Sequence, residues 1–193
     1  PPLSQRPLQT NQKNKRTKAK QQTGVDLEIT VENIKALREE MSAGVMDAKR
    51  ALEEAQGNID QARELLRERG VASAVKKADR SANEGLVEAY VHGGGRVGVM
   101  VEVNCETDFV ARTEDFKELA HNLAMQVAAM SPRYVDESDI PDDESAEASE
   151  IALMAQPYIK DASLSIKDLV LDVAGKLGEN IKVKRFSRYA LGE

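Results

Sequence analysis

The stretch Arg96–Arg112, with the sequence RVGVMVEVNCETDFVAR, decides the fold of this chain. Valine occupies every second position of its first half, and β-branched residues at a period of two predict a strand with one buried face. The alternation stops at Cys105, and a short polar run leads into Phe109. We therefore expect a strand that ends in a loop carrying Asp108 beside a large apolar ring. A loop held by a sheet is a common position for functional residues.

A second strand is expected immediately before this one, over Glu84–His92. The glycines Gly93–Gly95 separate the two strands and predict the turn of a β-hairpin. A phosphate-binding loop is the alternative, but it requires a following helix and a Lys-Ser or Lys-Thr pair. A strand follows here, so the hairpin is favoured.

Two helices and a last strand follow the loop. Thr113 can cap a helix with apolar residues at helical spacing, which Ser131–Pro132 ends. A further helix is expected over Ser163–Leu177, and a strand over Ile181–Tyr189, whose basic residues suit an edge. The order β-β-α-α-β predicts an α+β core with an antiparallel three-stranded sheet packed by helices. The inward residues of the first helix are Phe116, Leu119, Ala120, Leu123, Ala124 and Val127.

The segment before the hairpin predicts a three-helix module over residues 29–70. Its apolar stripes are separated by Ser42–Gly44 and Gln56–Gly57. Asn58 occupies the N-cap position of the third helix, and Gly70 is expected to end that helix. The module has no catalytic constellation, so we expect a helical binding module. The predicted stripes are Val31, Ile34, Leu37 and Met41; Met46, Lys49, Leu52 and Ala55; and Ile59, Ala62, Leu65 and Leu66.

Three other segments have less regular patterns. Residues 71–83 are rich in Ala and Lys and are expected to connect the module to the core, residues 84–193. Residues 1–28 have few large apolar side chains and many basic ones, which predicts a disordered basic tail. We interpret this tail as a solvated segment or linker, with an arm for RNA or an acidic partner as the alternative. Asp136–Glu150 is acidic without periodicity and is expected to be a mobile surface loop.

Composition argues against several classes of protein. No apolar run approaches the ~20 residues that span a bilayer, and no signal-peptide pattern follows the first basic residues. The net charge of −6, the aromatic content of 4% and the lack of Trp argue against general nucleic-acid binding outside the tail. A single cysteine cannot form an intramolecular disulfide and fits a reducing compartment. Because the chain opens with Pro-Pro, we expect a processed or trimmed product.

The titratable residues do not predict an enzyme, a metal site or a bound cofactor. His92, His121 and Cys105 lack metal-ligand spacing. Cys105 and His92 could meet across the hairpin as a nucleophile and its base, although a simply buried thiol is the more common arrangement. Glu106 and Asp108 could form an acid–base pair, but no second carboxylate cluster supports them. The sequence therefore favours a binding protein over an enzyme.

Two motifs are long enough to be specific. The first is Leu37–Arg38 followed by AGVMDAKRAL over Ala43–Leu52, and the second is VEVNCETDFVA over Val101–Ala111. Together they resemble the elongation factor Ts family, and the second matches the family pattern nearly residue for residue. The segment Gly178–Ile181 is also similar to the family. The resemblance covers residues 29–193.

The resemblance implies a guanine nucleotide exchange factor of translation elongation, whose partner is the GTPase elongation factor Tu. It implies that the module, which is similar to ubiquitin-associated domains, docks on the GTPase. It also implies that an acid and an aromatic ring after the central strand push against helices beside the nucleotide and disturb the Mg²⁺ and phosphate contacts of GDP. Such a factor acts by binding, without a cofactor. The implied contact residues are Arg38, Val45 and Met46 in the module and Thr107, Asp108, Phe109 and Val110 after the strand.

The chain departs from the family pattern in three places. Met41–Ser42 stands where the family usually has another pair before Ala43–Gly44, so the end of the first helix is expected to differ. Val45 replaces a more common Met, which would weaken that contact. The segment Pro141–Gln156 is shorter than the helical insertion that is usual in the family. Only one hairpin-and-helix core is present, and the similarity to short members implies a homodimer through the sheet and helices of the core.

Two other functions remain open at this point. One is a helical adaptor that binds ubiquitin-like or helical partners through Thr30–Gly70. The other is an RNA-associated fragment of a larger translation protein that uses the basic tail. The expected location is the cytoplasm, with the plastid stroma or the mitochondrial matrix as alternatives for a processed chain.

Overall fold

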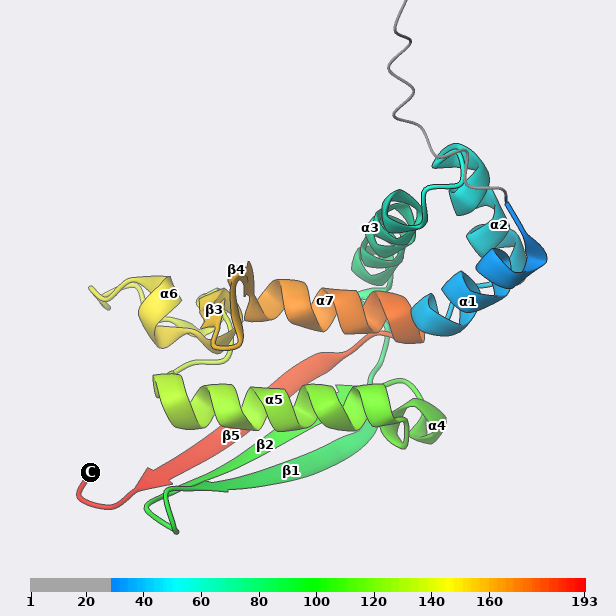
Figure 1. Cartoon of the computed structure of the whole chain (residues 1–193). Helices are drawn as coiled ribbons and strands as arrows, with labels where there is room; N and C mark the ends of the chain where they lie inside the picture. The colour runs from blue at the N-terminus through cyan, green and yellow to red at the C-terminus, as the bar shows by residue number, and fades with distance from the viewer. Residues whose placement is uncertain (1–28) are drawn as a thin grey trace, which may run out of the picture.

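A computed structural model describes residues 29–193, and the expected tail of residues 1–28 lies outside them. A small helical module is joined to a larger core by one long helix (Figure 1). The core contains helices and an antiparallel three-stranded sheet. The predicted α+β fold class is therefore confirmed.

The sheet has the strand order β1-β2-β5, and both pairings are antiparallel. Its strands are β1 (Glu84–His92), β2 (Val97–Cys105) and β5 (Lys182–Ala190). The predicted hairpin is confirmed, because β1 and β2 pair antiparallel on either side of Gly93–Gly95. All three glycines have positive φ, a region that other residues disfavour. The basic strand β5 lies at an edge, as expected.

The hairpin register separates the two residues considered as a thiol nucleophile and its base. Cys105 pairs with Glu84 at one end of the hairpin, whereas His92 pairs with Val97 at the other end. At about 3.3 Å per residue, the length of the hairpin lies between them. The suggestion that Cys105 and His92 meet is therefore wrong.

Two long helices lie on the same side of the sheet, and only the first packs directly on it. Helix α5 (Glu114–Met130) packs on β1 and β2, and α7 (Ile166–Leu177) lies over α5 in the view of Figure 1. The predicted inward residues of α5 are all buried. Thr113 and Ser165 cap the two helices, since each hydroxyl oxygen accepts a hydrogen bond from the backbone N–H three residues on. The second helix thus begins three residues later than the sequence predicts, after Ser165.

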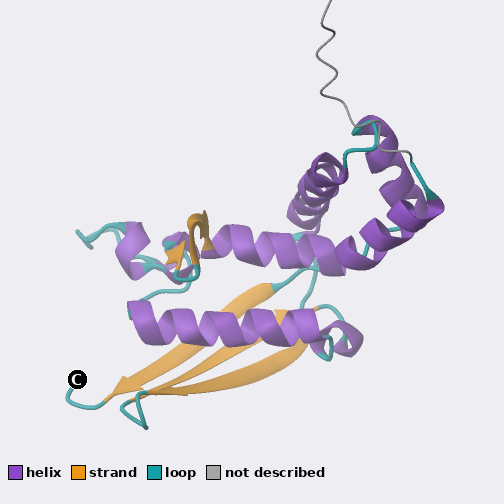
Figure 2. Ribbon diagram, in the orientation of Figure 1, coloured by secondary structure: helices purple, strands orange, loops and turns teal. Residues whose placement is uncertain are grey.

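The opposite face of the sheet is bare among the described residues, because the helices all lie on one side (Figure 2). Alternation along β1 and β2 places Val87, Val91 and Met100 on this open face. They are 56%, 67% and 54% exposed, and Tyr189 of β5 is 75% exposed. The open face therefore carries a group of apolar side chains in contact with solvent.

The module consists of α1 (Val31–Met41), α2 (Val45–Glu54) and the first half of α3 (Ile59–Lys77). Its core is formed mainly by Leu37 of α1 and Leu52 of α2, with alanines of α2 and α3 packed around them. Three predicted members of the stripes, Val31, Met46 and Lys49, are instead exposed. Val31 and Met46 lie in the first turns of their helices, outside the packed cluster, whereas Lys49 lies beside the buried face of α2 and pairs with Glu53. Asn58 caps α3 as predicted, accepting a hydrogen bond of 3.1 Å from the Gln61 N–H.

The third helix does not end at Gly70, so that prediction is wrong. Helix α3 continues to Lys77, and the connector expected over residues 71–83 begins inside it. Gly70 instead lies where the backbone of α3 meets Gly175 of α7. A glycine in the middle of a helix allows such a close approach, at some cost in helix stability.

The acidic stretch Asp136–Glu150 is not wholly irregular. It contains the 3₁₀ turn η1 (Glu137–Asp139), which Asp136 caps, and the start of α6 (Ala148–Ile151). The expected surface loop is confirmed between these turns, which the sequence does not predict because short turns leave no periodicity, and its mobility stays a prediction. Two more elements were not predicted: the 3₁₀ turn η2 (Leu153–Ala155) and a small hairpin of β3 (Pro157–Tyr158) and β4 (Asp161–Ser165).

Candidate functional site

The residues after β2 form a helical turn rather than a loop. Thr107 is the N-cap of α4 (Asp108–Ala111), and its hydroxyl accepts a hydrogen bond of 3.4 Å from the Val110 N–H. The carbonyl of Thr107 also accepts from the N–H of Ala111 at 3.3 Å. One turn is too short to show a helical period, so the sequence indicated only a polar run. The consequence is a fixed direction for Asp108 and Phe109.

Phe109 is the most exposed of the large apolar side chains in the described residues, at 79%. The next two residues hold the turn to the core, because Val110 is half-buried against it and Ala111 is buried. A phenylalanine of this kind gains about 1.5–3 kcal/mol when it is fully buried. The ring is therefore available for a partner surface on a turn that is itself anchored.

Asp108 lies beside the ring and is paired with a cation. Arg112 Nη2 donates a hydrogen bond of 2.7 Å to Asp108 Oδ2, and the side chains are 76% and 46% exposed, respectively. Exposed ion pairs of this kind contribute little to stability. Asp108 can therefore exchange Arg112 for another partner at low cost.

Glu179 anchors the chain just before α4. One carboxylate oxygen accepts hydrogen bonds from the backbone N–H groups of Glu106 and Thr107, both at 3.0 Å. The other oxygen accepts from the Thr107 hydroxyl at 2.6 Å. Glu179 follows the glycine that ends α7. The end of α7 therefore fixes the start of the turn that carries Phe109.

Asn180 ties the same region to the end of the α3 segment. Its backbone N–H donates to Glu106 Oε1 at 2.8 Å, and its side-chain amide donates to the carbonyls of Ala78 and Arg80 at 3.0 and 2.7 Å. The hydrogen bond from Asn180, with help from the Arg80 charge, lowers the pKa of Glu106. Sequence reasoning noted Gly178–Ile181 only as a segment similar to the family and assigned no role to Glu179 or Asn180. The only sequence signal was an acid and an amide directly after a helix-ending glycine.

The side chains considered for catalysis have other partners. Cys105 is fully buried and donates through Sγ to the Thr107 carbonyl at 3.1 Å. Burial raises the pKa of its thiol to about 11, so it is protonated at neutral pH. Glu106 and Asp108 are engaged by Asn180 and Arg112, respectively, rather than by each other. This part of the chain thus contains a supported, exposed surface, and it brings together neither a nucleophile with its base nor an acid–base pair.

The module contact residues lie around a different turn. Arg38 is in the last turn of α1, and Val45 and Met46 begin α2. The intervening Ser42 has the left-handed conformation, with φ of 50°, which brings the two helix ends together. Val45 and Met46 are 54% and 56% exposed, and Arg38 is exposed. The structure therefore groups the predicted site residues into two surfaces, one on the module and one on α4.

The structure thus presents two exposed surfaces with apolar side chains at their centres, one on a small helical module and one on an α+β core. The family model described as Elongation factor TS matches residues 13–152. Relatives named Elongation factor Ts include those of Moorella thermoacetica and Thermotoga neapolitana, each 47% identical over 195 residues. These alignments cover 86% of this chain and 96% and 99% of the relatives, respectively. A third, from Carboxydothermus hydrogenoformans, is 46% identical, with 86% and 90% covered.

The chain therefore belongs to the elongation factor Ts family, a family of translation elongation factors. Each of the alignments with the Moorella and Thermotoga relatives spans 195 positions, although only 86% of the 193 residues of this chain are aligned. Some aligned positions are therefore filled by the relative alone, so these relatives carry residues that this chain lacks. The predicted place of that difference, Pro141–Gln156, stays a prediction. In the described residues, no helix is both long and apolar enough to cross a membrane.

Proposed function

We propose that this chain binds elongation factor Tu carrying GDP and promotes release of the nucleotide, acting by binding and not as an enzyme. The observation that carries the proposal is the 79% exposed ring of Phe109 on a turn held by three hydrogen bonds to Glu179. A ring that is costly to expose and firmly supported suits insertion between elements of a partner. Membership in the family supplies the class of partner.

The proposed mechanism is differential binding. GDP is held through its phosphates and Mg²⁺, whose contacts depend closely on geometry. Insertion of Phe109 between helices beside the nucleotide would favour an open state of the GTPase, and Asp108 would act on the Mg²⁺ side. Because the factor and the nucleotide then favour different states, each weakens binding of the other. Burial of the ring makes about 1.5–3 kcal/mol available for opening.

The contacts of Arg38, Val45 and Met46 have a different role in this proposal. They bind the GTPase whether or not its nucleotide site is open, and so they supply affinity without favouring release. Thr107 and Val110 lie on either side of the proposed wedge and would contact the same partner helices.

The test is release of a fluorescent GDP from elongation factor Tu, followed by stopped flow. We expect Phe109→Ala to lower the maximal rate at least about tenfold, which corresponds to ~1.4 kcal/mol of lost transition-state stabilisation. Leu191→Ala is the matched control, since Leu191 is also a highly exposed apolar residue, at 70%. Release at the wild-type rate with Phe109→Ala would exclude the proposed wedge.

We further propose that two copies of the chain associate through the open face of the sheet. The exposed Val87, Val91, Met100 and Tyr189 on one face support this, since soluble monomers rarely leave such a group uncovered. Light scattering at micromolar concentration should give twice the chain mass, and Met100→Glu should give a single chain mass. Glu118→Gln, an exposed change on α5, is the control. A single-chain mass for the wild type would refute the dimer.

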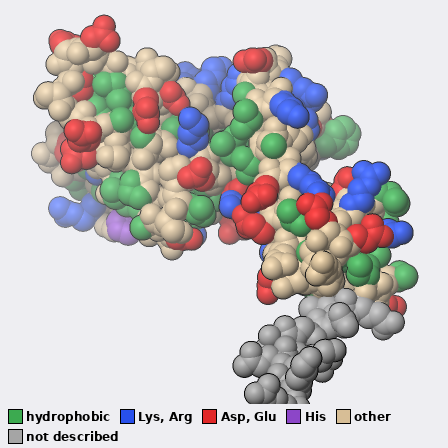
Figure 3. All heavy atoms as spheres, turned by 90° about the horizontal axis from the view of Figure 1, so that it is seen from above, with side chains coloured by type: hydrophobic (Ala, Val, Ile, Leu, Met, Phe, Trp, Pro, Cys, Tyr) green, Lys and Arg blue, Asp and Glu red, His purple; other side chains and the backbone are tan. Residues whose placement is uncertain are grey.

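The remaining alternatives differ in what they require. On the face of the molecule in Figure 3, acidic and basic side chains are interspersed over the module and the core helices, without a continuous basic patch. The RNA-associated alternative uses the basic tail, and deletion of residues 1–22 without effect on RNA association would remove it. A pull-down that recovers helical partners but no GTPase would favour the adaptor. We propose a cytoplasmic location, which imaging of a tagged chain would check.

A further inference from the structure

Helix α3 belongs to two hydrophobic cores at once. Ala62 and Leu66 are buried in the core of the module, whereas Ala74 is buried in the core formed with the sheet. Gly70 lies between Leu66 and Ala74 at a spacing of four residues, so all three lie on one face of the helix. The face that enters the module at one end therefore enters the main core at the other.

The backbones of α3 and α7 meet at two glycines. A Cβ atom added to Gly175 would lie 2.5 Å from the carbonyl carbon of Gly70, and one added to Gly70 would lie 3.3 Å from Gly175. A non-bonded contact of 2.5 Å is essentially never seen for a Cβ atom, so Ala at position 175 would force the two helices apart. At 3.3 Å, the neighbouring backbone needs to move by only a few tenths of an ångström. A glycine inside a helix is unfavourable relative to Ala. Two glycines that face each other at one helix crossing indicate that the crossing requires close approach of the two backbones.

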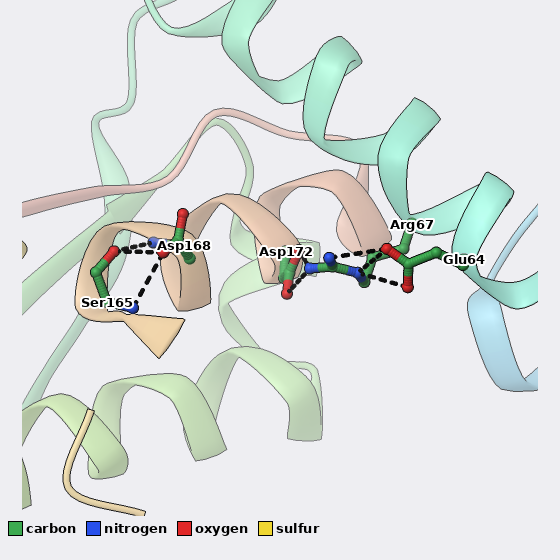
Figure 4. Close-up of polar contacts among 5 residues, drawn as sticks. All are labelled: Glu64, Arg67, Ser165, Asp168 and Asp172. Carbon is green, nitrogen blue, oxygen red and sulfur yellow. Dashed lines mark hydrogen bonds and ion pairs between the residues drawn. The ribbon is translucent and has the colours of Figure 1, made fainter. Parts of the chain in front are cut away.

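An ion pair bridges the same two helices one turn away (Figure 4). Arg67 Nη1 donates to both carboxylate oxygens of Asp172, at 3.0 and 2.9 Å, and Glu64 holds the other side of the guanidinium. At the far end, Lys77 Nζ donates to the carbonyl of Gly178 at 2.7 Å. The α3–α7 contact is thus fixed at three successive points.

The rest of the module is less closely packed on the core. A cleft of about 310 Å³ separates the α1–α2 turn from α7, and its walls include Gly44, Asp47 and Lys176. The angle of the module therefore depends chiefly on the α3–α7 crossing. Helix α7 is also linked to the turn that carries Phe109. Glu179, two residues after the end of α7, accepts hydrogen bonds from the backbone N–H groups of Glu106 and Thr107.

We propose that the α3–α7 clamp, formed by Gly70 with Gly175 and Arg67 with Asp172, is a positioning device that fixes the spacing between the module surface and Phe109. This inference rests on the proposed function for its purpose. When two contacts belong to one rigid body, binding of the first presents the second at high effective concentration. If the clamp is loosened, the two contacts no longer fit the GTPase together without a further ordering cost. The four clamp residues then affect nucleotide release only by positioning the module surface and Phe109, and they do not touch the nucleotide site.

The first measurement needs no GTPase. Spin labels on cysteines introduced at the exposed Glu39 and Glu118, in a Cys105→Ser background and diluted with an excess of unlabelled chain to suppress distances between copies, report the distance between module and core within one chain. We expect one narrow distribution for the parent chain and a shifted or broader one for Gly175→Ala. Gly70→Ala should change the distance distribution less, because a Cβ atom at Gly70 meets α7 less closely than one at Gly175 meets α3. An unchanged distribution in Gly175→Ala would overturn the clamp.

Arg67 has a close match for a control. Arg63 lies one turn earlier in α3 and is also held by two carboxylates, but those of Glu40 and Asp60 are both within the module. We expect Arg67→Met to broaden the distance distribution and Arg63→Met to leave it unchanged. The double exchange Arg67→Asp with Asp172→Arg should restore it. Equal effects of the two single changes would overturn the role of the bridge. These variants also serve if Gly175→Ala does not fold.

The second measurement is GDP release at varied factor concentration. Gly175→Ala should raise the half-maximal concentration about tenfold and leave the maximal rate within about twofold, because the wedge itself is intact. In a chain that already carries Arg38→Ala and Met46→Ala, the same change should have less than a twofold effect, because the module contact is gone. A tenfold effect in both backgrounds would refute positioning. If the parent chain does not promote GDP release from the GTPase, the proposed function is wrong. The distance measurement still tests the clamp in that case, because it needs no GTPase.

Discussion

The module surface and the α4 surface are built in different ways. Around the α1–α2 turn, Val45 and Met46 extend from the first turn of a helix whose N-cap, Gly44, makes no side-chain hydrogen bond. At α4, by contrast, the residues before Phe109 are held by the carboxylate of Glu179 and the amide of Asn180. We interpret the difference as one between a contact that needs only affinity and a contact that must withstand force from its partner.

The two regions also differ in the size of the core behind them. The module core has Leu37 and Leu52 as its only fully buried large side chains among the described residues, and the rest of its buried residues are mainly alanines. Behind α4 lie three valines of β2, Phe116 and the other inward residues of α5. Small cores provide little independent stability. The comparison predicts that the two surfaces can be disabled separately.

The largest effect is expected from Leu52→Ala, which removes a fully buried side chain from the module. A change of this kind lowers the free energy of unfolding by about 2–5 kcal/mol. Hydrogen exchange should show lost protection in α1 and α2 while β2 keeps its protection. Val31→Ala, at a position that is 76% exposed, is the control and should change stability by less than about 0.5 kcal/mol. Equal loss in β2 would mean that the two regions are not separable.

A smaller effect, on rate, is expected from Glu179→Ala. The change leaves the N–H groups of Glu106 and Thr107 and the Thr107 hydroxyl without their acceptor, and so loosens the turn that carries Phe109. We expect the maximal rate of GDP release to fall about 10–30-fold, or ~1.4–2 kcal/mol, with little change in half-maximal concentration. Glu118→Ala on the exposed side of α5 is the control.

Glu179→Gln sharpens the same test, because it keeps an acceptor for the backbone N–H groups but removes the charge. The maximal rate of GDP release with Glu179→Gln should lie between the rates of the wild type and of Glu179→Ala. If both variants released GDP at the wild-type rate, the network would have only a local structural role.

The smallest effect is expected from the pair Arg38→Ala and Met46→Ala on the module surface. Because both side chains are exposed in the free chain, their removal should leave the thermal midpoint of unfolding unchanged. The half-maximal concentration for GDP release should rise about tenfold, or ~1.4 kcal/mol, at an unchanged maximal rate. An unchanged half-maximal concentration would contradict the proposed docking contact.

Local patterns were sufficient to predict much of the core. The alternating valines of β2, the three glycines of the turn and the broad apolar face of α5 each identify an element from neighbouring residues alone. The predicted caps at Asn58 and Thr113 are confirmed for the same reason, since a cap bonds to a residue only three positions away.

The missed features depend on distant partners or on elements too short to have a period. Gly70 has the sequence appearance of a helix end, and only Gly175, far along the chain, explains why the helix continues. Glu179 receives its role from Glu106 and Thr107, which no local pattern connects to it. The single turn of α4 and the two-residue strand β3 are below the length at which periodicity is visible. The roles of the site residues toward a partner come from the family resemblance and stay predictions.

The continuity of α3 has a consequence for where the chain can be divided. A cut at Gly70 would leave the core with a free stub of seven residues that holds Ala74 and the Lys77 bond to Gly178, and would leave the module without the end of its longest helix. The segment between Lys77 and Glu84 has no helix or strand, and so it is the first place after Gly70 where a protease could cut without disrupting a helix or strand. A module excised for separate study should therefore extend through Lys77, and it will carry with it one side of its own docking surface for the core.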